Sequence, residues 1–399
     1  MVRAPSTIKS LLRKDKSWDT YLTKHGDSIR EVVRDAINQI LSCGLKVRGY
    51  ATWVCSKDDC SHTKIIPHSC SYRYCNTCGK KLTDQWIENQ KAILPDTEWQ
   101  HITFTMPDVL WPFFEHNRKL LKKLSKLAAR SILKYARKKG ILPGIFVALH
   151  TFGRPLNWHP HIHLSTTRGG LSDDHTQWKK LYFTKKSLMP QWRYAVTTLL
   201  RKAYKASELV LPPEMASQYP TKADVYRLFD EQYQRPWIIH FAKATKNPLR
   251  TINYLGRYLK RPPIAMSRLK HYDGSTVIFE FLNHNTGKHN QVKLSTEEFI
   301  ERFIRHIPEK GFRMIRYYGF LANRVRSKLL PKVYNLLEQP ERNAIKITYQ
   351  DMMIKSFGLD PLKCILCQSQ MVFAGITRGL SRGQLSKYEK QLALGKPIP

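Results

Sequence analysis

The sequence contains few acidic residues and no long apolar run. Only 31 residues are aspartate or glutamate, against 67 lysines and arginines, which gives a formal charge of +36. A protein with this charge repels itself unless a polyanion neutralises it, and nucleic acid is the usual polyanion. An acidic membrane surface is the alternative, but the chain shows neither an apolar run long enough to cross a bilayer nor a lipidation motif. The composition therefore predicts a protein that binds nucleic acid and no membrane.

Two further signals are missing. The first residues, MVRAPSTIKSLLRKDKSW, lack the apolar core of a secretory signal, so we expect a cytoplasmic, nucleoid-associated protein. No GxxxxGK[ST] motif appears, so strand separation must come from a partner protein or from nucleic acid that is already single-stranded. Hydrophobic residues make up 42 % of the chain, which is enough for a packed core.

The composition changes along the chain and divides it into segments. We expect an N-terminal helical segment, a metal-binding segment, a core of mixed strands and helices, an accessory hairpin with a helix, and a basic tail. Their boundaries are residues 1–45, 46–95, 96–270, 271–345 and 346–399. The second segment is rich in Cys, His, Gly and Lys without a strong period, so it needs metal to fold.

Hydrophobic periodicity predicts the elements within these segments. Residues 28–41, 113–140, 189–204, 247–261 and 296–305 have helical spacing, and residues 99–106, 144–152, 159–167, 237–244, 275–283 and 291–295 have strand character. The short GRPLN connection between 144–152 and 159–167 predicts an antiparallel hairpin. This order of elements indicates an α+β fold.

Three histidines alternate in the stretch NWHPHIHL. His161 and His163 share one face of the predicted strand, about 7 Å apart along it, and can point at one ion. His159 shares that face but lies about 13 Å from His163, which is too far for one small ion. The neighbouring strand of the hairpin offers His150 instead. We therefore predict a divalent metal held by His161, His163 and His150, with His159 as the second choice, against the simpler interpretation of a hydrogen-bonded histidine cluster.

The stretch YLGRY places Tyr254 and Tyr258 four residues apart. On a helix the two side chains share one face, about 6 Å apart along the axis. Tyrosine can act as a covalent nucleophile, and two tyrosines allow two cleavages in one active site. The simpler interpretation is that they pack or stack on bases.

Six of the eight cysteines are crowded into two short stretches, a pattern that indicates metal sites in a reducing compartment. We predict one tetrahedral zinc site from Cys55, Cys60, Cys75 and Cys78. Cys70 with His62 or His68 is a candidate second site, and the tail pair Cys364 and Cys367 is half of a site. Free structural thiols are the alternative.

Several motifs together resemble the insertion-sequence ninety-one family of rolling-circle transposases, in the two-tyrosine HUH nuclease class. The matching stretches are HSCSYRYCNTC, HITFTMP, LHTFGRPLNWHPHIHL, WIIHFAKATKNPLRTINYLGRYLKRPPIA, EEFIERFIRHIPEKGFRMIRYYG and DPLKCILC. The resemblance covers most of the chain and keeps the order of the motifs. The wider gap between Cys55 and Cys60, and the absence of a glycine after CILC, depart from the family pattern.

The resemblance implies a nuclease core with a central antiparallel sheet flanked by helices, a small N-terminal zinc-binding domain and a basic C-terminal region. It implies Mg²⁺ or Mn²⁺ as the catalytic ion, structural Zn²⁺, and a 5′-phosphotyrosine intermediate at Tyr254 or Tyr258. The expected partners are single-stranded DNA and hairpins at the ends of the element, with a host helicase, and the protein is expected to be a monomer or weak dimer.

Candidate DNA contacts lie near these motifs. Asn157 and Arg257 are adjacent to the predicted centre, and Arg313 and Arg316 belong to a basic stretch. Trp158, with Tyr72 and Tyr74, is expected to be exposed and to stack on bases. Two alternatives remain at this stage: a replication initiator or relaxase with the same chemistry, and a non-catalytic zinc-containing regulator that binds nucleic acid.

Overall fold

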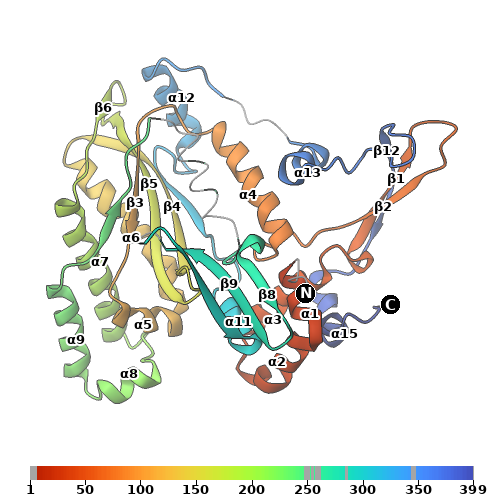
Figure 1. The fold of residues 1–399 in the computed structure, drawn as a ribbon. Coiled ribbons are helices and arrows are strands. Elements are labelled where there is room, and N and C mark those ends of the chain that lie inside the picture. Colours follow the sequence, from red (N-terminus) through yellow and green to blue (C-terminus); the bar gives the residue numbers. More distant parts are fainter. Residues whose placement is uncertain are drawn as a thin grey trace.

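The computed structural model describes residues 7–246, 252, 256, 262–283, 286–342 and 347–398. At its centre lies a six-stranded antiparallel sheet (Figure 1). Its strands follow the order β11–β4–β5–β3–β7, and β6 pairs with β5. The strands are β3 (Trp99–Phe104), β4 (Ile141–Phe152), β5 (Trp158–Ser172), β6 (Trp178–Lys180), β7 (Ile239–Phe241) and β11 (Ile315–Gly319).

The predicted hairpin of β4 and β5 is confirmed. The two strands pair antiparallel, and His150 lies directly opposite His161. The connection is tight because the Leu156 N–H donates to the Gly153 carbonyl at 3.2 Å, and the Gly153 N–H donates to the Asn157 carbonyl at 3.0 Å. Leu156 adopts φ of +61°, a conformation that a non-glycine residue rarely takes, and its side chain is fully buried.

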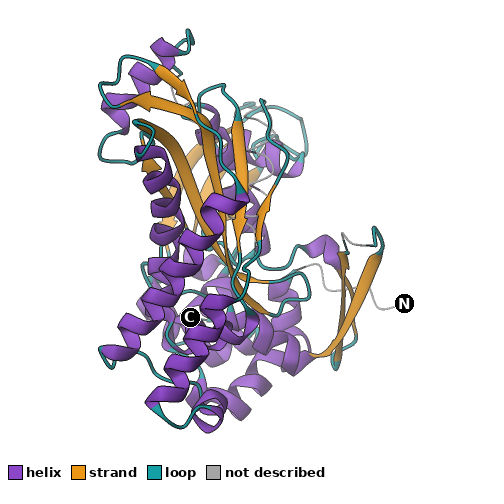
Figure 2. Cartoon of the chain, turned by 90° about the vertical axis from the view of Figure 1, so that its left-hand side faces the viewer, coloured by secondary structure: helices purple, strands orange, loops and turns teal. Residues whose placement is uncertain are grey.

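The two faces of this sheet differ because side chains alternate along each strand. One face presents apolar residues such as Val147, Leu149, Ile162 and Leu164 to the largest core cluster. Helices cover this face, and in Figure 2 they lie in front of the strands. They are α5 (Trp111–His116), α6 (Arg118–Arg137), α7 (Lys185–Lys205), α8 (Pro213–Gln218) and α9 (Lys222–Gln234).

The helix predicted over residues 113–140 is interrupted at Asn117. That residue adopts φ of −113° and ψ of 59°, and its amide donates to the Phe113 carbonyl and to the Val210 carbonyl. The break separates α5 from α6 because an asparagine side chain competes for backbone partners. Beyond it, α6 buries a stripe that includes Leu120, Leu124 and Ala128 and leaves its lysines outside.

The other sheet face is covered at one end by α4 (Asn76–Lys91) and α12 (Arg326–Leu336). Trp86 of α4 packs there with Trp99, Phe146 and Ile252 in a separate core cluster. A Cβ at Gly256 would lie 2.5 Å from Ile87 Cγ1, so the chain at Gly256 passes directly against α4. The remainder of this face carries the histidines.

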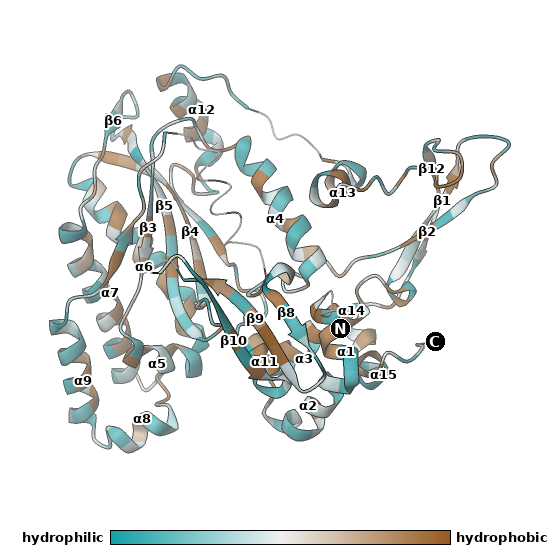
Figure 3. Cartoon of the chain, in the orientation of Figure 1, coloured by the Kyte–Doolittle hydropathy of each residue, from teal (hydrophilic) through white to brown (hydrophobic). Residues whose placement is uncertain are grey.

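A further core cluster joins segments from both ends of the chain. The N-terminal helices pack with an accessory three-stranded sheet, with α11 and with two short C-terminal helices. Figure 3 shows apolar residues in brown along β9 and α11. The elements are α1 (Ile8–Arg13), α2 (Ser17–His25), α3 (Glu31–Ser42), β8 (Leu269–Tyr272), β9 (Thr276–Leu282), β10 (His289–Ser295), α11 (Thr296–Arg305), α14 (Arg382–Ser386) and α15 (Glu389–Leu394). The predicted hairpin and the helix over 296–305 are confirmed.

A second three-stranded sheet projects from this body (Figure 1). It consists of β1 (Gly49–Cys55), β2 (Thr63–Pro67) and β12 (Met371–Arg378), with β1 in the centre. We call it the arm. Helix α13 (Tyr349–Phe357) precedes β12 and contacts α4. Residues 371–378 therefore return to the N-terminal region instead of forming a free tail.

None of the helices in the described part of the chain has the length and apolar character needed to cross a bilayer.

Candidate active site and metal centres

Three histidines converge on the polar face of the central sheet. His150 comes from β4, and His161 and His163 come from β5. Their candidate ligand nitrogens all lie within 4.8 Å of one another, and the Nε2 atoms of His161 and His163 are 3.1 Å apart. All three side chains are buried. The geometry thus brings together the three residues that the hairpin register predicts.

His159 lies beside this group without joining it. Its ring stacks on Trp111 at a centroid distance of 4.5 Å, while its backbone carbonyl is 2.8 Å from His161 Nδ1. A ring N–H at His161 Nδ1 donates to that carbonyl, which puts the lone pair on Nε2, the atom that faces His163 Nε2 and that would bind a cation. His159 therefore orients a ligand through its backbone, and the second-choice ligand is not part of the cluster.

His101 on β3 contacts the ring of His163. His101 Nε2 lies 3.1 Å from His163 Nδ1, and His101 Nδ1 lies 3.1 Å from Ser165 Oγ. These contacts fix the orientation of the His163 ring, a role that residues around metal ligands commonly have. His101 was not among the predicted site residues. The signal was the alternation in HITFTM, which places His101 and Thr103 on the same face as His163.

Burial keeps the imidazoles neutral. It lowers the pKa of His161 and of His163 well below 6.5, and the neighbouring histidines lower both pKa values further. Burial, and then the charge of His161, lower the pKa of His101 to about 4. At neutral pH these rings carry lone pairs instead of positive charges. Neutral imidazoles grouped on one face of a sheet suit a divalent ion that keeps open positions for another ligand.

The two predicted nucleophiles, Tyr254 and Tyr258, lie outside the described residues, as does Arg257. Two residues close to them in the sequence, Ile252 and Gly256, are described. Ile252 is buried in the cluster that contains Trp99, a residue on the same sheet face as His101. The chain that carries the YLGRY motif therefore reaches the histidine-bearing side of the sheet at Ile252.

The prediction that Trp158 stacks on bases is wrong. The residue is 6 % exposed, and its indole N–H donates to the Trp111 carbonyl at 3.0 Å. The Arg118 guanidinium lies 4.9 Å above the ring, and His306 stacks beside it. Trp158 is a core residue because β5 starts there with its side chain on the helix-covered face.

Tyr74, also expected to be exposed, is fully buried as well. Its hydroxyl donates to the His306 carbonyl, and its ring packs against Phe303 of α11. Tyr72 is half-buried and contacts Tyr74 at a centroid distance of 5.7 Å. The YRY stretch therefore fills the core behind the first cysteine cluster and does not present rings to solvent.

The remaining predicted DNA contacts lie in different places. Asn157 is half-buried in the β4–β5 turn, where its amide nitrogen lies 3.4 Å from the Trp158 carbonyl. Arg313 is exposed and lines a cavity of about 380 Å³ together with Arg73, Trp86 and Tyr317. Arg316 lies opposite Val147 in the sheet, so it belongs to the face away from the histidines. Arg316 therefore does not share the cavity that Arg313 lines.

The cysteines form two separate groups of four, which corrects the predicted site of Cys55, Cys60, Cys75 and Cys78. Cluster one consists of Cys43, Cys70, Cys75 and Cys78. Its sulfur–sulfur distances include 3.6 Å for Cys43 and Cys78, and 3.6 Å for Cys70 and Cys78. Cys43 was not among the predicted ligands; it follows α3 and has no cysteine nearby in the sequence. The fold places the end of α3 beside the start of α4.

Cluster two consists of Cys55, Cys60, Cys364 and Cys367, so the tail pair completes the pair on the arm. His62 is a neighbour of this cluster, with Nδ1 3.1 Å from Cys364 Sγ. His68 belongs to neither cluster, and its Nδ1 lies 3.2 Å from the Arg48 carbonyl. The proposed pairing of Cys70 with either histidine is therefore also corrected. All eight cysteines are free of disulfides.

Comparison with known proteins gives the chain its family. Residues 144–328 match a family described as "Putative transposase", and residues 14–106 match a "Transposase zinc-binding domain". The chain is 43 % identical over 379 residues to the transposase for insertion sequence element IS801 of Pseudomonas savastanoi pv. phaseolicola, which covers 94 % of this chain and 91 % of that protein. It is also 29 % identical over 395 residues to the putative transposase y4qJ of Sinorhizobium fredii, covering 96 % and 98 % of the two chains. No solved structure matches the chain.

A transposase binds DNA and moves its element by cutting and joining strands, which accounts for the strongly basic composition of the chain. The zinc-binding region matched by the second family contains six of the eight clustered cysteines, so structural zinc accounts for their arrangement. Because the similarity to the IS801 protein extends over nearly the whole chain, the protein is a transposase of the insertion-sequence ninety-one family.

Proposed function

We propose that this transposase cuts and rejoins single-stranded DNA through a 5′-phosphotyrosine intermediate, in the manner of a two-tyrosine HUH nuclease, and so supports rolling-circle transposition. Tyr254 and Tyr258 are the proposed nucleophiles. The observation that carries the proposal is the convergence of His150, His161 and His163 on the sheet face that the YLGRY-bearing chain reaches at Ile252. The substrate would be single-stranded DNA or a hairpin at the end of the element.

The histidines fit a catalytic divalent ion. His161 and His163 have pKa values well below 6.5 and are uncharged at neutral pH, the three rings lie within ligand distance of a common centre, and backbone and side-chain partners hold at least two of the rings in place. Mn²⁺ suits this donor set better than Mg²⁺, because imidazole nitrogen is a softer ligand than carboxylate or water oxygen. When bound, the ion would draw charge from the scissile phosphate and orient it for in-line attack.

The covalent step begins at the phenol oxygen of Tyr254 or Tyr258. This oxygen forms a bond to the scissile phosphorus, and the bond between phosphorus and the 3′ oxygen breaks. The phenol proton is lost to water, and the leaving 3′ oxygen takes up a proton to become a hydroxyl. The second tyrosine repeats the cleavage elsewhere, and attack of a 3′-hydroxyl on a phosphotyrosine reverses the bond changes and rejoins the strands. No nucleoside triphosphate is consumed.

The DNA would approach through the cavity beside α4. Arg313 supplies an exposed positive charge there, and Trp86 and Tyr317 form its aromatic wall. We assign phosphate contacts to Arg313 and, from their positions in the sequence, to Arg257 and Asn157. Cluster one would hold structural Zn²⁺ that fixes the start of α4 against α3.

The test uses labelled single-stranded DNA from the end of the element. The full-length protein is incubated with it, with and without Mn²⁺ or Mg²⁺, and denaturing electrophoresis detects a covalent adduct. We expect a metal-dependent adduct in the wild type and none in the Tyr254→Phe, Tyr258→Phe double variant. Tyr182→Phe is the matched control, because Tyr182 is exposed and lies beside β6, away from the histidines.

Two results contradict the proposal. An adduct that persists in the double variant would assign the nucleophile to another residue. Tight DNA binding without any adduct, under either metal, would exclude tyrosine nuclease chemistry for this DNA and leave strand cutting to a different group.

A further inference from the structure

The arm has little of the apolar burial that normally holds a small sheet together. Most of β12 is exposed, including Phe373 at 57 % and Ile376 at 63 %. Residues of β1 and β2 are half-buried at best over most of their length. A three-stranded sheet without a covered apolar face is only marginally stable in water. Another interaction must therefore hold β12 against β1.

Cluster two lies where β1 ends and β12 begins, because Cys55 pairs with Met371. The Sγ atoms of Cys55 and Cys367 are 3.3 Å apart, and those of Cys60 and Cys364 are 3.8 Å apart. Four thiolates at 2.3 Å from a tetrahedral Zn²⁺ would be about 3.8 Å from one another. Disulfides would need about 2.05 Å. The four sulfurs thus have the spacing of a tetrathiolate metal site.

The backbone around the sulfurs also has the form of two metal-binding knuckles. The Lys57 N–H donates to Cys55 Sγ at 3.5 Å, and the Cys60 N–H donates to the Lys57 carbonyl at 3.0 Å. On the tail side, the Gln368 N–H donates to the Cys364 carbonyl at 3.1 Å, with Gln368 at φ of +66°.

We propose that Cys55, Cys60, Cys364 and Cys367 form a second, independent Zn²⁺ site that fastens the C-terminal segment to the N-terminal arm. Two of its ligands lie far outside residues 14–106, which match the zinc-binding family. The site is therefore shared between the two ends of the chain, and the arm folds only when both ends are present. This inference does not depend on the tyrosine chemistry.

Zinc content of the full-length protein tests the site. We expect two Zn²⁺ per chain in the wild type, and one in the Cys364→Ser, Cys367→Ser double variant. The Cys43→Ser, Cys70→Ser variant is the matched control, because it removes two ligands from cluster one and should also leave one ion. Two ions retained in the tail variant, or one ion in the wild type, would overturn the proposal.

Cysteine alkylation followed by peptide mass spectrometry tests it in the unmutated protein, in case a variant does not fold. Cys55, Cys60, Cys364 and Cys367 should resist alkylation together and become reactive together when a chelator is added. Alkylation of Cys364 and Cys367 while Cys55 and Cys60 stay protected would separate the pairs and exclude a shared site.

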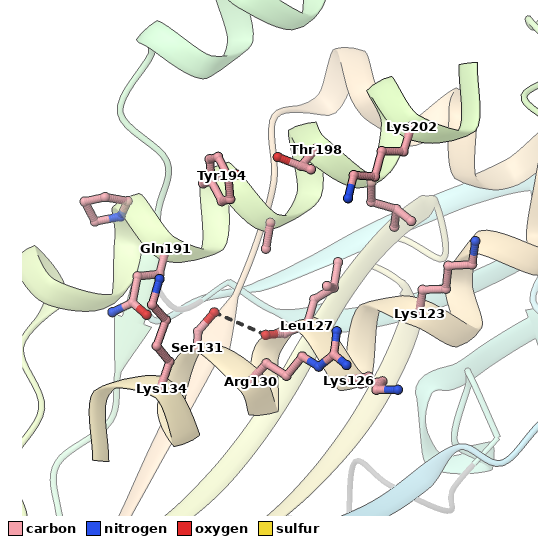
Figure 4. A pocket seen from close by; sticks show the side chains of 13 residues that line it. Lys123, Lys126, Leu127, Arg130, Ser131, Lys134, Gln191, Tyr194, Thr198 and Lys202 are labelled. Carbon is pink, nitrogen blue, oxygen red and sulfur yellow. Dashed lines mark hydrogen bonds between the residues drawn. The ribbon is translucent and has the colours of Figure 1, made fainter. Parts of the chain in front are cut away.

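A different observation concerns the outer surface of α6 and α7, on the far side of the sheet from the histidines. A groove of about 800 Å³ runs between the two helices (Figure 4). Among the described residues, its lining contains five cationic side chains and no carboxylate: Lys123, Lys126, Arg130, Lys134 and Lys202. The floor is apolar, with Leu127 and Leu199, and Tyr194 stands at the edge with 60 % of its surface exposed.

We infer that this groove binds a single strand of DNA. Cations at intervals of three and four residues on one helix face follow a phosphodiester backbone, while an apolar floor and an exposed tyrosine receive bases. The bases of a duplex are stacked inside the helix, so a duplex would contact only the cationic side chains of the groove. The inference rests on the DNA binding of a transposase and not on how the strand is cut.

Fluorescence anisotropy with a labelled single strand, without divalent metal, tests the groove. Lys126→Glu with Arg130→Glu should reduce the slope of log K against log salt by about 1.4, since two phosphate contacts are lost. Lys288→Glu with Lys293→Glu on the accessory hairpin is the charge-matched control. An equal loss of slope in both variants would mean that only overall charge matters.

Tyr194→Ala should weaken binding of the single strand at least fivefold, as expected for loss of one stacked base. Tyr182→Ala controls for removal of an exposed tyrosine, and a duplex of the same sequence controls for stacking. Unchanged single-strand affinity in Tyr194→Ala would exclude base stacking in the groove.

Discussion

The two faces of the central sheet consist of the same strands, yet neighbouring residues have opposite roles. His161 and His163 point to one side, and Ile162 between them lies at 0 % exposure on the other. The apolar face is a closed core under α6 and α7, whereas the other face concentrates buried polar rings that bind one another. Burying these rings costs stability in the absence of a ligand. One hairpin can therefore supply both core residues and candidate metal ligands, because side chains alternate between the two faces along each strand.

The largest expected effect is on cleavage, from a substitution on the histidine-bearing face of β5. His161→Ala should reduce adduct formation about a thousandfold, because loss of a ligand removes several kcal/mol of charge stabilisation at the phosphate. Folding should be retained, which circular dichroism and urea denaturation will check. Wild-type cleavage by a folded His161→Ala protein would show that the histidine face is structural.

The adjacent substitution should have the opposite outcome. Ile162→Ala removes a fully buried side chain from the helix-covered face and should lower the free energy of unfolding by about 3 kcal/mol. Cleavage per folded molecule should stay within a fewfold of the wild type. Urea denaturation followed by tryptophan fluorescence gives the first quantity, and adduct formation corrected for the folded fraction gives the second. A stable but inactive variant would mean that the two faces are not separable.

A smaller effect is expected at the partner of a ligand. His101→Ala leaves all three predicted ligands but removes the group that orients His163. Metal affinity should fall about 10- to 100-fold, with cleavage restored at high Mn²⁺. Cleavage rates over a range of Mn²⁺ concentrations distinguish this from loss of the maximal rate. His116→Ala is the control, since that ring is exposed on α5.

The smallest effect concerns a histidine outside the cluster. His306 directly follows α11 and packs against the end of β4, where its ring contacts Thr151 Oγ1 and the Leu156 carbonyl. Burial lowers the pKa of His306 to about 3. The unfolded chain binds a proton near pH 6.5 while the folded protein does not. Stability is therefore complete above pH 6.5 and declines as pH falls toward 3, by at most about 2 kcal/mol between pH 7.5 and 5. Urea denaturation at both pH values should show a smaller difference for His306→Gln than for the wild type.

The local patterns predicted the histidine hairpin well. Its strands are adjacent in sequence, the Gly-Pro connection is short, and a period of two fixes which residues share a face. The same reasoning works for β9, β10 and α11. It failed for Trp158, because alternation says which residues share a face but not which face is covered by helices.

The cysteines show the limit of local patterns. Spacing within the N-terminal stretch suggested that Cys55 and Cys60 join Cys75 and Cys78, which are near in sequence. The structure pairs them with Cys364 and Cys367, because β12 returns to β1. The spacing of cysteines predicts which two residues form one half of a zinc site. Which two halves combine depends on a long-range strand pairing that neither short stretch of sequence reveals. Cys43 was missed for the same reason, since α3 and α4 meet only in the fold.

The separation of these partners has a consequence for biosynthesis. Cys60 and Cys364 are 304 residues apart. At a translation rate of about 5 to 20 residues per second, Cys364 is synthesised roughly 15 to 60 s after Cys60. During that time β1 has only β2 as a neighbour, and its other edge is unpaired. A nascent chain that stops early never closes this edge, so completion of the arm marks a molecule that has been translated through its last cysteine.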